Sequence, residues 1–199
     1  MKKILFVLLY ALAALAQANP VVLFDTTEGR FAVELFKDKV PTTVENFLAY
    51  VRSGYYDDTL FHRVIADAKM AIVQGGGYTQ FDRDGVVEKS GLRDPIPLEI
   101  RKDLPNTAYT LAMARQQASN SATAQFFINA KDNSAQFDGA YAVFGKILSG
   151  CSGCEKLVDR MVATPIKPIK VEKFGEATFA AKNVPATPIR ILSATVLQD

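Results

Sequence analysis

The chain has 199 residues, of which 49% are hydrophobic and 22% are charged. These fractions are typical of a single globular domain and argue against a disordered, collagen-like or disulfide-dense chain. With one histidine and two cysteines, the sequence lacks the residues for a multi-histidine or four-cysteine metal site. We therefore expect no metal site of either kind.

The first 18 residues have the pattern of a secretory signal peptide. Lys2 and Lys3 form a basic head, residues 4–16 are an uncharged apolar run, and Ala16-Gln17-Ala18 places small residues where a signal peptidase reads. The run is shorter than the roughly 20 apolar residues that span a bilayer. We expect cleavage after Ala18, a mature domain over residues 19–199 and no membrane segment after cleavage.

Cleavage would also remove the net charge, because the formal charge of +2 falls to zero without the two lysines. A neutral domain without a basic run has little electrostatic reason to bind nucleic acid. The short basic head resembles bacterial signals, so we expect a periplasmic protein, with secretion beyond the periplasm left open. Export implies an oxidising compartment, in which Cys151 and Cys154 can form a disulfide.

The mature chain begins with a predicted hairpin. Apolar runs at residues 21–24 and 31–36 flank a turn that contains Gly29. A helix is predicted next, since Pro41 can open it, Gly54 can end it, and the apolar residues between them recur on one face. That apolar stripe consists of Val44, Phe47, Leu48 and Val51.

The rest of the chain predicts short strands. Residues 164–188 hold four of the nine prolines, so much of this stretch is expected to be loop or sheet edge. A second helix is predicted over residues 155–161. Many short strands with two helices favour a closed antiparallel barrel capped at its ends by the helices, because closure leaves no exposed sheet edge. The remaining predicted strands are 60–65, 72–74, 109–114, 125–130, 141–148 and 189–197.

Two features that resemble catalytic motifs are better explained as structure. His62 lies between Phe61 and Arg63 in a strand-like run, which favours a buried structural histidine over the proton shuttle of a catalytic triad. The glycines at 75–77 are followed neither by Lys-Ser/Thr nor by a helix pattern, so they predict a tight turn or close backbone approach rather than a phosphate loop.

Six segments occur together in the order of a known family. From about Val21 to Leu197 the sequence resembles the cyclophilin-type peptidyl-prolyl cis-trans isomerases, and most closely their exported bacterial members, which often have a tyrosine at the position of Tyr141. The segments are Phe61-His62-Arg63-Val64-Ile65, Gln74-Gly75-Gly76-Gly77, Leu111-Ala112-Met113-Ala114-Arg115, Ser121-Ala122-Thr123-Ala124-Gln125-Phe126-Phe127-Ile128-Asn129, Phe137-Asp138-Gly139 and Tyr141-Ala142-Val143-Phe144-Gly145-Lys146.

This resemblance implies an eight-stranded antiparallel barrel capped by two helices. It also implies a monomeric enzyme that rotates Xaa-Pro bonds in unfolded or partly folded polypeptides without a cofactor. Arg63 would be the catalytic residue, and Gln74 would bind the substrate backbone and orient Arg63. Phe127, Phe137 and Tyr141 would line the proline pocket, while Gln125, Ala114 and Arg115 would bind the chain on either side. Since one of two adjacent strand residues faces the core, we assign Phe126 to the core.

The sequence departs from the family pattern near this site. Eight residues, Ala66 to Val73, separate Ile65 from Gln74, where five are typical; Ile72 would replace a pocket methionine, with Ala71 or Met70 beside it. The insertion keeps open a third hypothesis, a peptide-binding chaperone without isomerase activity. Arg115 stands where many members have asparagine. Gln136 stands where many have tryptophan, which predicts weak cyclosporin binding.

Cys151-Ser152-Gly153-Cys154 lies outside the family pattern. It follows a predicted strand and precedes a predicted helix, whose N-terminus would lower a thiol pKa. A thiol-disulfide redox enzyme is therefore the main alternative function. The motif lies late in the chain and outside a βαβ pattern, which favours a structural or incidental disulfide.

Overall fold

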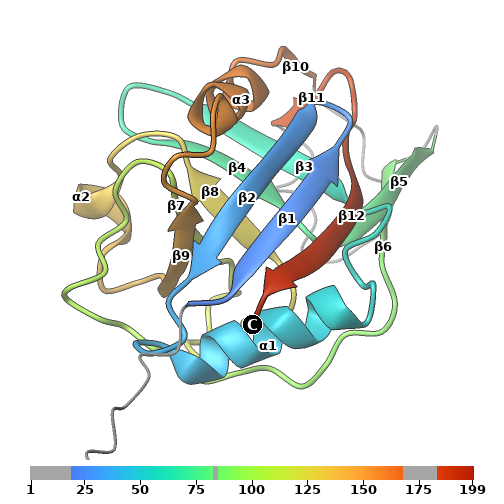
Figure 1. Cartoon of the computed structure of the whole chain (residues 1–199). Helices are drawn as coiled ribbons and strands as arrows, with labels where there is room; N and C mark the ends of the chain where they lie inside the picture. The colour runs from blue at the N-terminus through green and yellow to red at the C-terminus, as the bar shows by residue number, and fades with distance from the viewer. Residues whose placement is uncertain (1–18, 83–84, 168–182) are drawn as a thin grey trace, which may run out of the picture.

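Eight antiparallel strands close into a barrel in the order β1-β12-β3-β4-β8-β7-β9-β2 (Figure 1). The structure is a computed structural model that describes residues 19–82, 85–167 and 183–199. It confirms the predicted barrel, and each predicted strand matches one barrel strand. The strands are β1 (Val21–Thr26), β2 (Gly29–Leu35), β3 (Leu60–Ala66), β4 (Ala71–Gly75), β7 (Thr110–Met113), β8 (Phe126–Asn129), β9 (Val143–Ile147) and β12 (Ile189–Gln198).

Two longer helices cover opposite ends of this barrel. Helix α1 (Pro41–Arg52) crosses the lower end in Figure 1, and α3 (Cys154–Val162) lies over the upper end. Both insert buried apolar side chains into one hydrophobic core, as their predicted stripes require. Within the described residues, no helix has the length and hydropathy needed to cross a membrane.

The barrel interior is filled by aromatic rings. Phe126 is fully buried in this core and packs edge-on against Phe47 and Tyr56, as assigned from the alternation of β8. The predicted close approach at the glycines is confirmed, since a Cβ on Gly75 would lie 2.7 Å from the Phe61 ring. Gly76 has φ +82° and also faces core rings, so both the backbone angle and the space favour glycine there.

Helix α1 is capped by a residue distant in sequence. Its N-cap residue, Val40, offers no side-chain acceptor. Instead, the Glu99 carboxylate accepts hydrogen bonds from the Thr42 and Thr43 backbone N–H groups, at 3.3 and 2.6 Å, and from the Thr43 hydroxyl at 2.6 Å. A carboxylate at this position satisfies exposed N–H donors and complements the helix dipole.

Several small elements were missed by the sequence-based prediction. The one-turn helix α2 (Ser134–Phe137) is too short to show helical periodicity, so the prediction of two helices is incomplete. Strands β5 (Tyr78–Asp82) and β6 (Gly85–Glu88) form a separate two-stranded sheet, and the two-residue strands β10 (Ile166–Lys167) and β11 (Val184–Pro185) form another. The predicted signal peptide lies outside the described residues.

Candidate active site

Strand pairing brings the predicted catalytic residue beside its predicted partner. Arg63 on β3 is opposite Gln74 on β4, and Gln74 is opposite Phe127 on β8. Directly opposite residues share one face of a sheet, so their side chains meet. Arg63 Nη1 donates to Gln74 Oε1 at 3.1 Å, and Gln74 Nε2 donates to Gln125 Oε1 at 3.0 Å. The guanidinium is therefore held at one end of a row of hydrogen-bonded side chains, Arg63–Gln74–Gln125.

Three aromatic rings lie beside these hydrogen-bonded side chains. Phe127, Phe137 and Tyr141 contact one another edge-on, with centroids 5.1 to 5.4 Å apart. Phe127 comes from β8, whereas Phe137 ends α2 and Tyr141 lies between α2 and β9. Such edge-to-face contacts fix the orientation of each ring. The rings form an apolar wall separate from the barrel core.

A cavity of about 230 Å³ lies against these groups. It contains eight of the nine predicted catalytic and substrate-binding residues. Gln125 instead lines an adjacent cavity of about 240 Å³, which shares Gln74, Ala114 and Arg115 with the first. The residues lining the first cavity are Arg63, Ile65, Met70, Ile72, Gln74, Ala114, Arg115, Phe127, Phe137 and Tyr141.

The predicted set omits one lining residue, Ile65, and leaves open whether Ala71 or Met70 joins Ile72. The structure places Met70 on the cavity wall, whereas Ala71 is buried and absent from the lining. Ile65 could have been found from its pairing with Ile72 across the β3–β4 hairpin, because paired residues share a face.

The inserted residues lengthen this hairpin without closing the cavity. Residues 66–69 are exposed, and the register runs from Arg63–Gln74 to Ala66–Ala71. The turn is held by Asp67, whose Oδ1 accepts from the Lys69 and Met70 N–H groups, each at 2.8 Å. These hydrogen bonds lower the pKa of the Asp67 carboxyl.

Arg63 has an unusual environment for a charged group. Burial lowers the pKa of its guanidinium, and the nearby Tyr141 partly offsets this effect. Its Nε atom is buried and has no hydrogen-bond partner among the described residues. An unpaired buried donor is costly, and a catalytic role is one reason for a fold to keep such a group. The arginine therefore keeps donor capacity beyond its bond to Gln74.

Arg115 is fixed over the aromatic wall. Its guanidinium carbon lies 5.3 Å from the centroid of the Tyr141 ring. Its Nε donates to the Ala140 carbonyl at 2.8 Å, and its Nη1 donates to the carbonyls of Gln116 and Gln117 at 2.9 and 3.1 Å. These bonds and the cation–π contact hold the backbone on both sides of the cavity together.

His62 is a core residue, as predicted. It is 1% exposed, packs edge-on against Tyr78 at 4.6 Å between centroids, and does not line the cavity. Burial lowers the pKa of its imidazole from 6.5 to about 3. A histidine that is buried and neutral cannot exchange protons with a substrate in the cavity, so acid–base chemistry by this residue is excluded.

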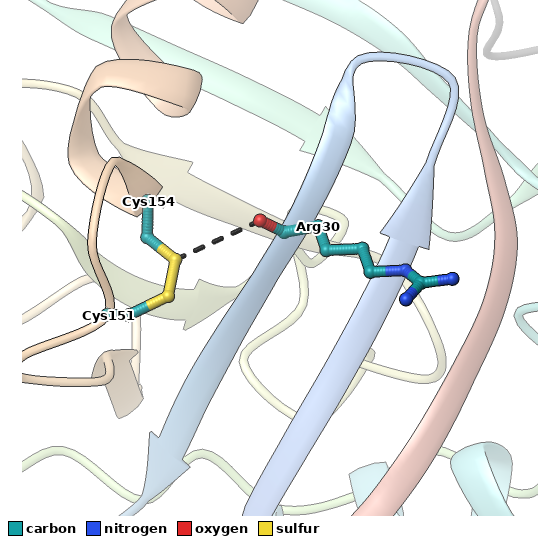
Figure 2. Close-up of a disulfide and its surroundings, with 3 residues drawn as sticks. All are labelled: Arg30, Cys151 and Cys154. Carbon is teal, nitrogen blue, oxygen red and sulfur yellow. Dashed lines mark hydrogen bonds between the residues drawn. A yellow bond between two sulfur atoms is a disulfide. The ribbon is translucent and has the colours of Figure 1, made fainter.

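The two cysteines lie apart from the cavity. Cys151 and Cys154 form a disulfide at the start of α3, with their Cα atoms 5.6 Å apart (Figure 2). Neither residue lines either cavity beside Arg63. Among the described residues, no group of three or more histidine, cysteine or acidic side chains is arranged to hold a metal ion.

Both the sequence and the fold are similar to those of known proteins. The model of the family "Cyclophilin type peptidyl-prolyl cis-trans isomerase/CLD" matches residues 21–196. The peptidyl-prolyl cis-trans isomerase cyp18 of Streptomyces antibioticus is 44% identical over 180 residues, covering 87% of this chain and 96% of the relative. Isomerase B of Escherichia coli is 42% identical over 144 residues, covering 69% of this chain and 83% of that protein.

A solved structure of the same family has a similar fold at lower sequence identity. A cyclophilin-type isomerase of Cryptosporidium parvum, crystallised in the presence of the dipeptide Ala-Pro, superposes with a TM-score of 0.66 at 25% identity, covering 90% of this chain and 99% of that one. The barrel and the match over nearly all described residues lead to one conclusion: this chain belongs to the cyclophilin-type peptidyl-prolyl cis-trans isomerase family.

Proposed function

We propose that this protein accelerates rotation about Xaa-Pro peptide bonds, with Arg63 as the catalytic residue. The proline ring would occupy the cavity against Phe127, Phe137 and Tyr141, and the flanking chain would contact Gln74, Gln125 and the backbone at Ala114 and Arg115. The substrates would be proline-containing unfolded or partly folded polypeptides.

The reaction needs neither a nucleophile nor a cofactor. Amide resonance gives the C–N bond a rotational barrier of about 18–20 kcal/mol. In the twisted transition state the resonance is lost, and the proline nitrogen becomes pyramidal and gains a lone pair. A donor directed at that lone pair, or at the neighbouring carbonyl oxygen, binds the transition state more strongly than the planar ground state, which accelerates the reaction.

The observation that carries this proposal is the position of the Arg63 guanidinium. Gln74 orients one of its nitrogens, its Nε has no partner among the described residues, and both residues line the aromatic cavity. Arginine suits the role because its planar fork keeps its charge even when partly buried. The apolar wall would hold the proline ring while the rest of the chain rotates.

A protease-coupled assay tests the activity directly. A protease that cleaves only the trans form of an Ala-Pro-containing peptide reports the rate at which the cis form converts. We expect the purified domain to raise this rate in proportion to its concentration. A domain that binds the peptide without raising the rate would be the peptide-binding chaperone instead, and the isomerase proposal would be wrong.

We further propose that the protein is exported, acts on exported proteins in the periplasm and is monomeric there. The support is the basic head, apolar run and small-residue end of residues 1–18. Expression of the full chain in a bacterium with an outer membrane tests this: periplasmic fractions should contain a monomer that begins at Asn19. A product that keeps Met1 in the cytoplasmic fraction would contradict export.

A further inference from the structure

We infer that the Cys151–Cys154 disulfide is a second reactive site, which undergoes thiol–disulfide exchange with external thiols through Cys151. The inference does not depend on the isomerase mechanism, because neither sulfur belongs to a residue of the Arg63 cavities.

The two cysteines differ in accessibility. Cys154 is 1% exposed and belongs to the barrel core, whereas Cys151 is partly exposed at the surface. Exposed Ser152 and Gly153 separate them. Gly150 and Gly153 have positive φ angles, and the space around their missing Cβ atoms is open to 4 Å. An incoming thiolate can therefore approach Cys151, while Cys154 is shielded.

The surroundings of Cys154 favour its departure as a protonated thiol. It is the first residue of the nine-residue helix α3, whose N-terminus stabilises the negative charge that develops on the departing sulfur. Burial of this sulfur in the apolar core then favours its neutral, protonated form. Its Sγ lies 3.9 Å from the backbone carbonyl oxygen of Arg30 on β2, as Figure 2 shows. Once protonated, the Cys154 thiol can donate to that carbonyl, so the reduced form has a hydrogen-bond acceptor ready in the fold.

The fold does not depend on the disulfide for the position of α3. The cysteines are only three positions apart, and the stabilisation from closing a loop is smallest for short loops. Buried Leu157, Val158 and Met161 anchor the helix in the core. At its other end Arg160 Nη2 donates to the Glu28 carbonyl at 3.2 Å. The barrel should therefore remain folded when the disulfide is reduced.

An external thiolate attacks Sγ of Cys151, a mixed disulfide forms, and the Cys151–Cys154 bond breaks with its electron pair on Cys154 Sγ, which takes up the proton that the external thiol lost. A second external thiolate then attacks the external sulfur of the mixed disulfide and displaces Cys151 Sγ, which takes up the proton of the second thiol. The products are an external disulfide and the protein dithiol, so two thiols are oxidised and the protein disulfide is reduced.

The test uses the native protein and two matched variants. Wild-type protein in reduced glutathione, followed by alkylation and intact-mass measurement, should gain two alkyl groups while its near-ultraviolet circular dichroism stays native. With oxidised glutathione, Cys154→Ser should form a mixed disulfide at Cys151 at least tenfold faster than Cys151→Ser forms one at Cys154. A reduced, unfolded protein offered in place of glutathione shows whether protein thiols also react.

Reaction with glutathione or with the reduced, unfolded protein supports the site and shows which kind of thiol can reduce the disulfide. The inference is overturned if the wild-type disulfide is reduced only when denaturant is added, a result that does not require either variant to fold. Equal rates for the two variants would also overturn it, because Cys151 would then not be the preferred point of attack. Isomerase activity is measured alongside, so loss of one property is distinguished from loss of the other.

Discussion

Arg63 and Gln74 lie opposite each other on β3 and β4, and the arginine Nη1 donates to the glutamine Oε1 at 3.1 Å. Gln74 in turn donates to Gln125, so its amide cannot rotate without breaking one of the two bonds. The guanidinium is thereby positioned by an amide on the adjacent strand rather than by an acidic partner.

Replacing Arg63 tests the catalytic role. Arg63→Ala removes a charge-assisted hydrogen bond of about 1.5–3 kcal/mol to the transition state, so kcat/KM for a Xaa-Pro peptide should fall roughly ten- to a hundredfold. The protease-coupled assay measures this, with Lys156→Ala on exposed α3 as a control that should keep the wild-type rate. An unchanged rate in folded Arg63→Ala would remove this residue from the mechanism.

Gln74→Leu separates positioning from chemistry. The variant keeps Arg63 but removes the acceptor of its hydrogen bond, so we expect a smaller loss in kcat, on the order of tenfold, corresponding to about 1.4 kcal/mol. Gln74→Glu restores an acceptor and should recover part of the rate. Equal rates for Gln74→Leu and Gln74→Glu would show that the hydrogen bond does not set the reactivity of Arg63.

Gln136 should decide cyclosporin sensitivity. It is exposed on α2 immediately before the cavity residue Phe137, at the position where many family members have tryptophan. We expect weak inhibition of the wild type, and about tenfold tighter inhibition of Gln136→Trp, because an indole would add apolar contact area and an N–H donor worth about 1.4 kcal/mol. Inhibition curves for both proteins measure the shift; identical curves would contradict the assignment.

The single histidine should make the protein sensitive to mild acid. Because the pKa of His62 falls from 6.5 to about 3 on folding, the unfolded chain binds a proton that the native chain does not. The contribution of neutral His62 to the free energy of unfolding is fully present above about pH 6.5 and decreases as the pH falls toward 3. At pH 5 the free energy of unfolding should be lower by about 2 kcal/mol. Urea unfolding at pH 7 and pH 5 measures this loss.

Nuclear magnetic resonance provides the control for the same residue. The chain has one histidine, so its imidazole signal is unambiguous. We expect no titration of the native signal between pH 8 and pH 5. A midpoint near the ordinary value of about 6.5 would show that the imidazole is accessible to protons and would contradict its burial.

Glu99 should stabilise α1 from a distance. Glu99→Ala removes the acceptor for the Thr42 and Thr43 donors and should lower the free energy of unfolding by about 1–2 kcal/mol. For a domain of this size the melting temperature should fall by roughly 2–4 °C per kcal/mol. Glu99→Gln keeps an acceptor and should lose less. Calorimetry distinguishes these outcomes, and a larger loss in the glutamine variant would contradict the capping role.

Local patterns predicted the elements of the barrel. Residues 21–36 contain two apolar runs around a turn, and the apolar residues of α1 recur at helical spacing. The hairpin and α1 could therefore be predicted from residues close together in the sequence. Periodicity carries no such signal for α2, which has a single turn. The predicted site residues depended on a family resemblance, since nothing in the spacing of Arg63 and Tyr141 says that they meet.

Amino-acid order by itself determined which residues can form strands and helices, because backbone preference and the alternation of buried and exposed side chains act over a few residues. The tertiary fold decided that Glu99 caps α1, that Phe137 lines the same cavity as Arg63, and that Cys154 faces Arg30. Those contacts join segments far apart in the chain. Their geometry follows from strand register and loop path, which a local pattern does not contain.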